Sequence, residues 1–117
     1  MSIRRPAAVA AFVLVLALPG VALALPSAAH DTTVRVTARE YSFKLSRKTV
    51  PAGKVTFTIK NAGHLSHNFT IAGHKSKTIG PGKTTILTVT LKKGTYPYKC
   101  SVDSHAKFGM KGVLRVM

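Results

Sequence analysis

Hydrophobic and polar residues alternate with a period of two along most of the chain after residue 30. The alternating segments are rich in β-branched and aromatic residues, and they are 33–38, 41–45, 54–60, 67–71, 85–91, 96–100 and 112–117. This alternation is typical of strands that bury one face. Turn-forming residues separate several of them, as at Gly80-Pro81-Gly82. The pattern contains no repeat and no convincing helix. It therefore predicts one all-β domain, a Greek-key β-sandwich or barrel of about seven to eight strands.

The first thirty residues have a different pattern. Two arginines precede an apolar run at 7–18, and several alanines follow it. A basic start, an apolar centre and an A-x-A-like end predict a secretory signal peptide over 1–29, with cleavage after residue 24 as an alternative. The other interpretation is an uncleaved membrane anchor, although Pro19-Gly20 interrupts the run before it reaches a spanning length. We therefore expect an exported protein, periplasmic or extracellular, in which 30–117 form the single domain.

The composition is strongly basic, with 18 Lys and Arg residues against three Asp and Glu and a formal net charge of +15. Such a charge favours anionic partners and does not determine the fold. The basic residues are scattered singly through the alternating segments and form no basic helix or tract. Export also argues against nucleic acid. We therefore expect a partner that is not nucleic acid.

The only cysteine, Cys100, stands close in sequence to two other residues that bind soft metals, His105 and Met110. A single cysteine cannot form an internal disulfide, which small exported domains usually contain. It is therefore either buried and inert or committed to some chemistry. Along 96–100 the alternation places Lys99 toward water, so Cys100 is expected to point inward at the end of its strand.

A second histidine is expected to point inward as well. His67 shares a strand face with Phe69 and Ile71, at the start of the segment 67–71. The two strand ends could bring His67 and Cys100 together at one pole of the sandwich. Two imidazoles, a thiolate and a thioether match the trigonal His₂Cys group with a weak axial Met of blue-copper sites. The chain lacks the paired CxxC or HxxxH ligands of structural zinc. No oxyanion loop or orienting residue is evident for a catalytic cysteine.

Three stretches of the chain resemble the cupredoxins, the family that includes plastocyanin, azurin and pseudoazurin. They are "VPAGKVTFTIKNAG", "HNFTI" and "GTYPYKCSVDSHAKFGMKGVLRV", and the last is the most specific. The resemblance implies that His67, Cys100 and His105 bind one type-1 copper ion. It also implies that Met110 is the axial ligand. Asn68 matches a residue that ties the two ligand loops together by hydrogen bonding near the thiolate.

One position departs from the family pattern. Many cupredoxins have Pro-Gly just before the second histidine, and this chain has Asp103-Ser104. An acidic side chain two residues from a ligand could accept a hydrogen bond or favour Cu(II), which would lower the redox potential. The alternative is a solvated loop residue without such a role.

The resemblance implies a carrier of single electrons that cycles between Cu(I) and Cu(II). It would not be an enzyme, because four ligands leave no open position for a substrate. A copper-binding, copper-delivery or copper-resistance protein is one alternative, and a cupredoxin-like accessory domain of a larger complex is another. A Met-rich or His-rich tract would favour delivery, and none follows the signal.

An electron-exit patch is expected around the edge of the His105 imidazole. Leu65, Ala106 and Phe108 are apolar residues in the loops next to the ligands, and exposed apolar patches commonly mark interaction sites. Lysines such as Lys107 would border the patch. We therefore expect a monomer that is steered toward an acidic redox protein or an anionic membrane-associated electron-transfer complex.

Overall fold

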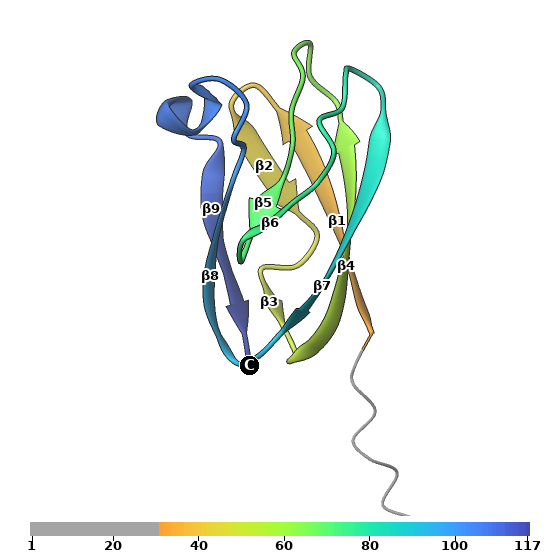
Figure 1. Cartoon of the computed structure of the whole chain (residues 1–117), viewed down its shortest axis with the longest axis vertical. Coiled ribbons are helices and arrows are strands. Elements are labelled where there is room, and N and C mark those ends of the chain that lie inside the picture. Colours follow the sequence, from red (N-terminus) through yellow and green to blue (C-terminus); the bar gives the residue numbers. More distant parts are fainter. Residues whose placement is uncertain (1–30) are drawn as a thin grey trace, which may run out of the picture.

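Two mixed β-sheets face one another over residues 31–117, the part of the chain that this computed structural model describes (Figure 1). The four-stranded sheet has the order β2-β1-β4-β7, with β1 at Thr32–Arg39, β2 at Ser42–Leu45, β4 at Gly53–Asn61 and β7 at Thr84–Leu91. The five-stranded sheet has the order β3-β9-β8-β5-β6, with β3 at Thr49–Val50, β5 at Thr70–Ile71, β6 at His74–Lys75, β8 at Gly94–Lys99 and β9 at Lys111–Val116. A short 3₁₀ helix, η1 (His105–Phe108), lies between β8 and β9.

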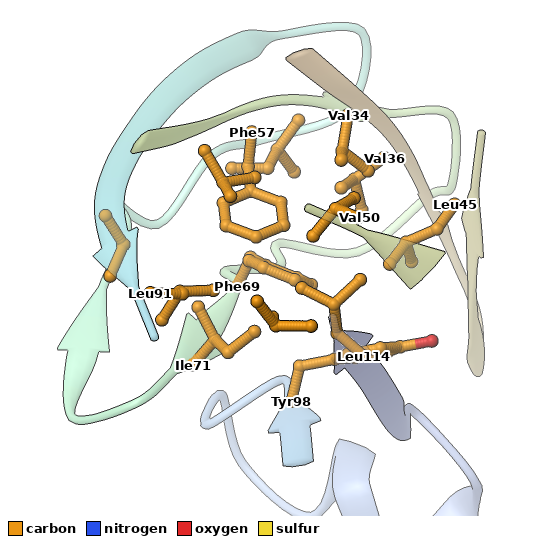
Figure 2. Close-up of a cluster of buried hydrophobic side chains, with 14 of the residues drawn as sticks. Val34, Val36, Leu45, Val50, Phe57, Phe69, Ile71, Leu91, Tyr98 and Leu114 are labelled. Atoms are coloured by element: carbon orange, nitrogen blue, oxygen red, sulfur yellow. The ribbon is translucent and has the colours of Figure 1, made fainter. Parts of the chain in front are cut away.

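The hydrophobic core lies between the sheets and is built from their inward-facing alternate residues (Figure 2). In β4 the inward residues Val55, Phe57 and Ile59 are completely buried. The ring centroid of Phe57 lies 5.0 Å from that of Phe69, which precedes β5 in the other sheet. A fully buried side chain of this size contributes about 1.5–3 kcal/mol to folding. The alternate residues of the two sheets thus pack against one another, as Phe57 does against Phe69, and this packing holds the sheets together.

The pairing register brings several connections to one pole of the sandwich. In the parallel pair β1–β4, Thr32 is opposite Val55 and Ala38 is opposite Asn61, so both strands end at this pole. Lys99 and Lys111 pair at the adjoining ends of β8 and β9. The β1–β2 turn, the segment after β4 and the β8–β9 connection with η1 therefore meet at the upper end of Figure 1.

The all-β fold predicted from the sequence is confirmed, with nine strands in the described residues against the seven to eight expected. The difference arises from two-residue strands such as β3 and β6. The segment 67–71 was expected to be a continuous strand. Only Thr70–Ile71 form β5, and His67 pairs through an isolated bridge with Ile79.

The predicted signal peptide, 1–29, lies outside the described residues. Within residues 31–117, no helix has the length and apolar character that a membrane span requires. Export and cleavage therefore remain predictions from the sequence.

Candidate metal centre

Three donor atoms converge at the pole where the connections meet. His67, Cys100 and His105 are all buried there. The two Nδ1 atoms of the histidines are 3.2 Å apart, and Cys100 Sγ lies 3.9 Å from His67 Nδ1 and 3.6 Å from His105 Nδ1. Metal–imidazole bonds are about 2.0 Å long and metal–thiolate bonds about 2.3 Å, so two donors of one ion stand no more than about 4 Å apart. The observed separations therefore suit a single ion held by all three residues.

Backbone hydrogen bonds hold the main chain at His67, shortly before β5, and at Cys100, directly after β8. His67 exchanges two of them with Ile79, at 3.0 and 2.8 Å, which fix its backbone next to the chain that leads into β7. Cys100 follows the last residue of β8, and its N–H donates to the Met110 carbonyl at 3.0 Å. These contacts fix the main chain at His67 and Cys100, and with it the points from which their side chains start.

Met110 lies beside Cys100 in the loop that also carries His105. It is completely buried and packs with Cys100 and Ala38 in a small apolar cluster at this pole. Its N–H donates to the His105 carbonyl at 3.2 Å, which closes the loop on itself. Gly109, which ends η1, has φ 109°, a left-handed conformation that favours glycine. The role of Met110 as axial ligand stays a prediction, and the loop places its side chain next to the thiol.

Asn68, the residue after His67, is almost completely buried and bonds to Ser101, the residue after Cys100. Its Nδ2 donates to Ser101 Oγ at 2.8 Å, and its Oδ1 accepts from the Ser101 N–H at 2.8 Å. The two segments that carry His67 and Cys100 are thereby joined side by side.

Asn61 is a structural residue of the site that the sequence pattern does not reveal. Its buried Nδ2 donates to the carbonyls of Leu65 and Ile79, at 2.7 and 2.8 Å. Its Oδ1 accepts from the Gly63 N–H at 2.9 Å. Asn61 therefore shapes the connection that leads into His67.

Glu40 also contacts the site, although no local sequence pattern indicates this. Its Oε1 lies 2.9 Å from His67 Nε2 and accepts the N–H groups of His64 and Leu65 at 2.8 and 2.7 Å. Burial raises the pKa of Glu40, but the hydrogen bonds from Leu65, His67 and the neighbouring backbone outweigh it and lower the pKa from 4.5 to about 2. An ionised carboxylate only accepts hydrogen bonds, so His67 Nε2 is the donor.

An aromatic cluster covers His105. The ring of Tyr41 lies 5.4 Å from the imidazole of His105 and 5.0 Å from the ring of Phe108, between centroids. His105 itself is only 5% exposed, whereas Phe108 is 64% and Leu65 43% exposed. Ala106 is half-buried beside them. Their role as an electron-exit patch stays a prediction.

Strand alternation over 41–45 predicts that Tyr41 faces inward with Phe43 and Leu45. It is 38% exposed, because it lies in the turn between β1 and β2, where strand alternation does not apply. Asp103 is exposed and has φ 44°, a left-handed conformation that aspartate tolerates better than most residues. His64 and His74 are exposed and contribute no donor to the three-residue cluster.

A β-sandwich with two histidines and a cysteine converging at one pole defines a small copper protein of the blue-copper type. A family model described as a cupredoxin-like domain matches residues 7–116. The chain therefore belongs to the cupredoxin family, and its cluster of His67, Cys100 and His105 fits one type-1 copper site.

Solved structures with the same fold include several copper proteins. Dithionite-reduced auracyanin from Roseiflexus castenholzii is 27% identical, with a TM-score of 0.64, over 74% of this chain and 97% of that one. Rusticyanin from Thiobacillus ferrooxidans is 23% identical, with a TM-score of 0.58, over 74% and 77%. A copper nitrite reductase from Nitrosomonas europaea is 24% identical, with a TM-score of 0.61, over 74% and 41%. The last two show similarity of fold alone. A comparison with curated proteins finds no match.

Proposed function

We propose that the protein carries single electrons between redox partners by Cu(I)/Cu(II) cycling. The observation that carries this proposal is the buried convergence of two imidazole nitrogens and one thiol sulfur, all within 3.9 Å of one another. Thiolate sulfur suits Cu(I) and imidazole suits both oxidation states. The bound copper would supply a one-electron redox couple.

The way the donors are held favours electron transfer. His67 and Cys100 are fixed by backbone hydrogen bonds, and the Asn68–Ser101 pair joins their segments. A site held in this way keeps nearly the same shape in both oxidation states, so little reorganisation accompanies each transfer. Copper delivery would instead require a site that opens to release the metal.

The fold alone does not distinguish a carrier from an enzyme, because a copper nitrite reductase is among the similar structures. Support for a carrier comes from the ligand set. If Met110 completes the coordination of His67, Cys100 and His105, no position remains open for a substrate. We therefore propose that the protein catalyses no reaction of its own.

Two features of the sequence support the proposed location and partners. The signal-like segment 1–29 supports export to the periplasm or the cell exterior. Residues 30–117 hold 16 of the 18 Lys and Arg residues and all three acids, and their formal net charge of +13 supports docking to an acidic redox protein or to an anionic membrane-associated electron-transfer complex.

Adding Cu(II) to the copper-free protein while recording the visible spectrum tests this function. We expect one equivalent to produce an intense blue or green charge-transfer band and a reversible one-electron wave in voltammetry. Cys100→Ser should abolish the band, because the transition originates on the thiolate. His74→Ala is the control, since His74 is exposed and lies outside the donor cluster. Colourless stoichiometric binding would overturn the carrier proposal and favour copper delivery.

A further inference from the structure

A single carboxylate oxygen connects the β1–β2 turn to the metal centre. Glu40 Oε1 contacts His67 Nε2, the His64 N–H and the Leu65 N–H at 2.9, 2.8 and 2.7 Å. Within residues 31–117, the contact with His67 is the one pairing of an acid with a basic side chain at salt-bridge distance. The oxygen therefore bonds both a donor side chain of the site and the loop that leads to it.

We propose that Glu40 is a positioning residue of the copper site, which orients His67 and favours Cu(II) over Cu(I). This inference rests on the copper-binding function proposed above. It adds a residue that lies 27 positions from His67 in the sequence and is not itself a metal ligand.

The connection before His67 is shaped to receive the carboxylate. A Cβ on Gly63 would lie 2.6 Å from Glu40 Oε2 and 2.8 Å from Cδ, closer than real Cβ atoms approach other atoms. Gly63 is held in place by its hydrogen bond to Asn61. A glycine at this position thus leaves room for the carboxylate, while the next two backbone N–H groups bind it.

The carboxylate also determines which imidazole nitrogen is free. A carboxylate can only accept hydrogen bonds, so the 2.9 Å contact with Glu40 Oε1 favours the His67 tautomer that carries its proton on Nε2. The lone pair of Nδ1 is then available on the side where Cys100 Sγ and His105 Nδ1 lie, at 3.9 and 3.2 Å. A carboxylate in this position makes a metal-binding histidine a stronger donor and fixes its ring orientation.

Glu40 supplies a negative charge next to the site in a protein with few acidic residues. The chain has three acidic residues against 18 basic ones, and one of the three lies against a candidate ligand. Only about a fifth of its side chain is exposed, so solvent screens the charge incompletely. A negative charge beside the site stabilises Cu(II) more than Cu(I), which lowers the redox potential.

Glu40→Gln tests the charge, because glutamine keeps the shape and an oxygen that can accept the same hydrogen bonds. We expect Cu(II) affinity to fall by about 10–100-fold, the usual cost of losing such a partner. Cu(I) affinity should fall less. Each tenfold difference between the two losses raises the potential by ~59 mV for a one-electron couple. Asp103→Asn is the matched control, since it neutralises an exposed acid of the ligand loop, and its potential should stay near that of the parent protein.

A measurement without copper tests the orientation independently. In ¹⁵N NMR spectra of the copper-free protein, His67 should carry its proton on Nε2, and Glu40→Ala should produce a mixture of tautomers. Gly63→Ala should displace the carboxylate without removing its charge and shift the tautomer in the same direction. This second variant keeps the test decisive if Glu40→Ala does not fold.

The possible outcomes separate this inference from the proposed function. If the parent protein fails to bind copper, the proposed function fails first, and the NMR result alone decides whether Glu40 orients His67. If the parent protein is blue and Glu40→Gln shifts the potential no more than Asp103→Asn, the inference is overturned while the carrier function stands. An unchanged His67 tautomer in both Glu40→Ala and Gly63→Ala would also overturn it.

Discussion

Asn68 and Ser101 are joined by two hydrogen bonds of 2.8 Å, one through the serine hydroxyl and one through its backbone N–H. Each residue directly follows a candidate copper ligand. The pair therefore couples the position of His67 to that of Cys100 across 33 residues of sequence.

Asn68→Ala should destabilise the protein, because it leaves the Ser101 N–H without its partner in a partly buried position. We expect the free energy of unfolding to fall by about 1–3 kcal/mol. Urea denaturation of the copper-free protein measures it. Ser101→Ala is the control, since it removes one bond and keeps the backbone bond to Oδ1, and its effect should be smaller. Equal effects of the two variants would mean that the backbone bond contributes nothing.

Met110→Leu should preserve the charge-transfer colour and raise the redox potential. The thiolate expected to give the colour remains, while loss of the thioether would remove the proposed weak ligand and make the surroundings more apolar. Such a swap of similar volume usually costs less than about 1.5 kcal/mol of stability. Voltammetry and visible spectra measure both properties. Leu114→Met is the control, because Leu114 is completely buried in the main core away from the site. A potential that Met110→Leu leaves unchanged would identify Met110 as a core residue only.

Phe108→Asp should slow electron exchange with the redox partner without altering the visible spectrum. A charge at the exposed edge of the aromatic cluster would disrupt an apolar docking surface but leave the donor atoms in place. Met117→Asp is a matched control, since Met117 is 65% exposed and Phe108 64%, and the two lie at opposite poles (Figure 1). Stopped-flow measurements of the electron-exchange rate with the partner compare the two variants. Equal slowing by both variants would contradict an exit route through this patch.

The bimolecular electron-transfer rate with an acidic partner should fall steeply as salt is added. Steering by exposed charges acts mainly on association, and the Debye length shortens to ~8 Å at physiological ionic strength. A domain whose residues 30–117 have a formal net charge of +13 should therefore associate fastest at low salt. Rates across a salt series provide the test. A flat or rising dependence would mean that the lysines serve solubility and not docking.

Tyr98 should make the stability of the protein fall at alkaline pH. Burial raises the pKa of its phenol above 10.0 because the ionised form is poorly solvated there. The folded state then holds a proton that the unfolded state has lost, so stability falls as the pH rises above about 10. Tyr98→Phe should flatten this part of the curve relative to the parent protein. Thermal unfolding of both proteins between pH 9 and pH 11 measures this difference. Equal losses of stability with rising pH in the two proteins would contradict a role of Tyr98.

The sequence predicted the long strands well, because β1, β4 and β7 run for eight or nine residues and show period-two alternation throughout. Two-residue strands such as β3 carry no such signal. The inward orientation of His67 was predicted correctly from Phe69 and Ile71, although His67 itself forms only an isolated bridge.

Glu40 and Tyr41 could not be predicted as neighbours of the site. Nothing in their local sequence relates a hairpin turn to a histidine 27 residues later. That contact depends on the parallel pairing of β1 with β4, which brings the ends of both strands to one pole. Long-range pairing of this kind is set by the whole core, so local alternation does not reveal it.

Strand pairing also places the start of β1 and the end of β9 at one pole of the sandwich. Thr32 lies opposite Val55 near the start of β4, and the Met117 carbonyl accepts the Ala52 N–H just before that strand. Both ends therefore leave from the pole opposite the donor cluster (Figure 1). Attachment of the protein to an electrode or a carrier through either end would direct the metal centre toward the solution, where it stays accessible to a diffusing partner.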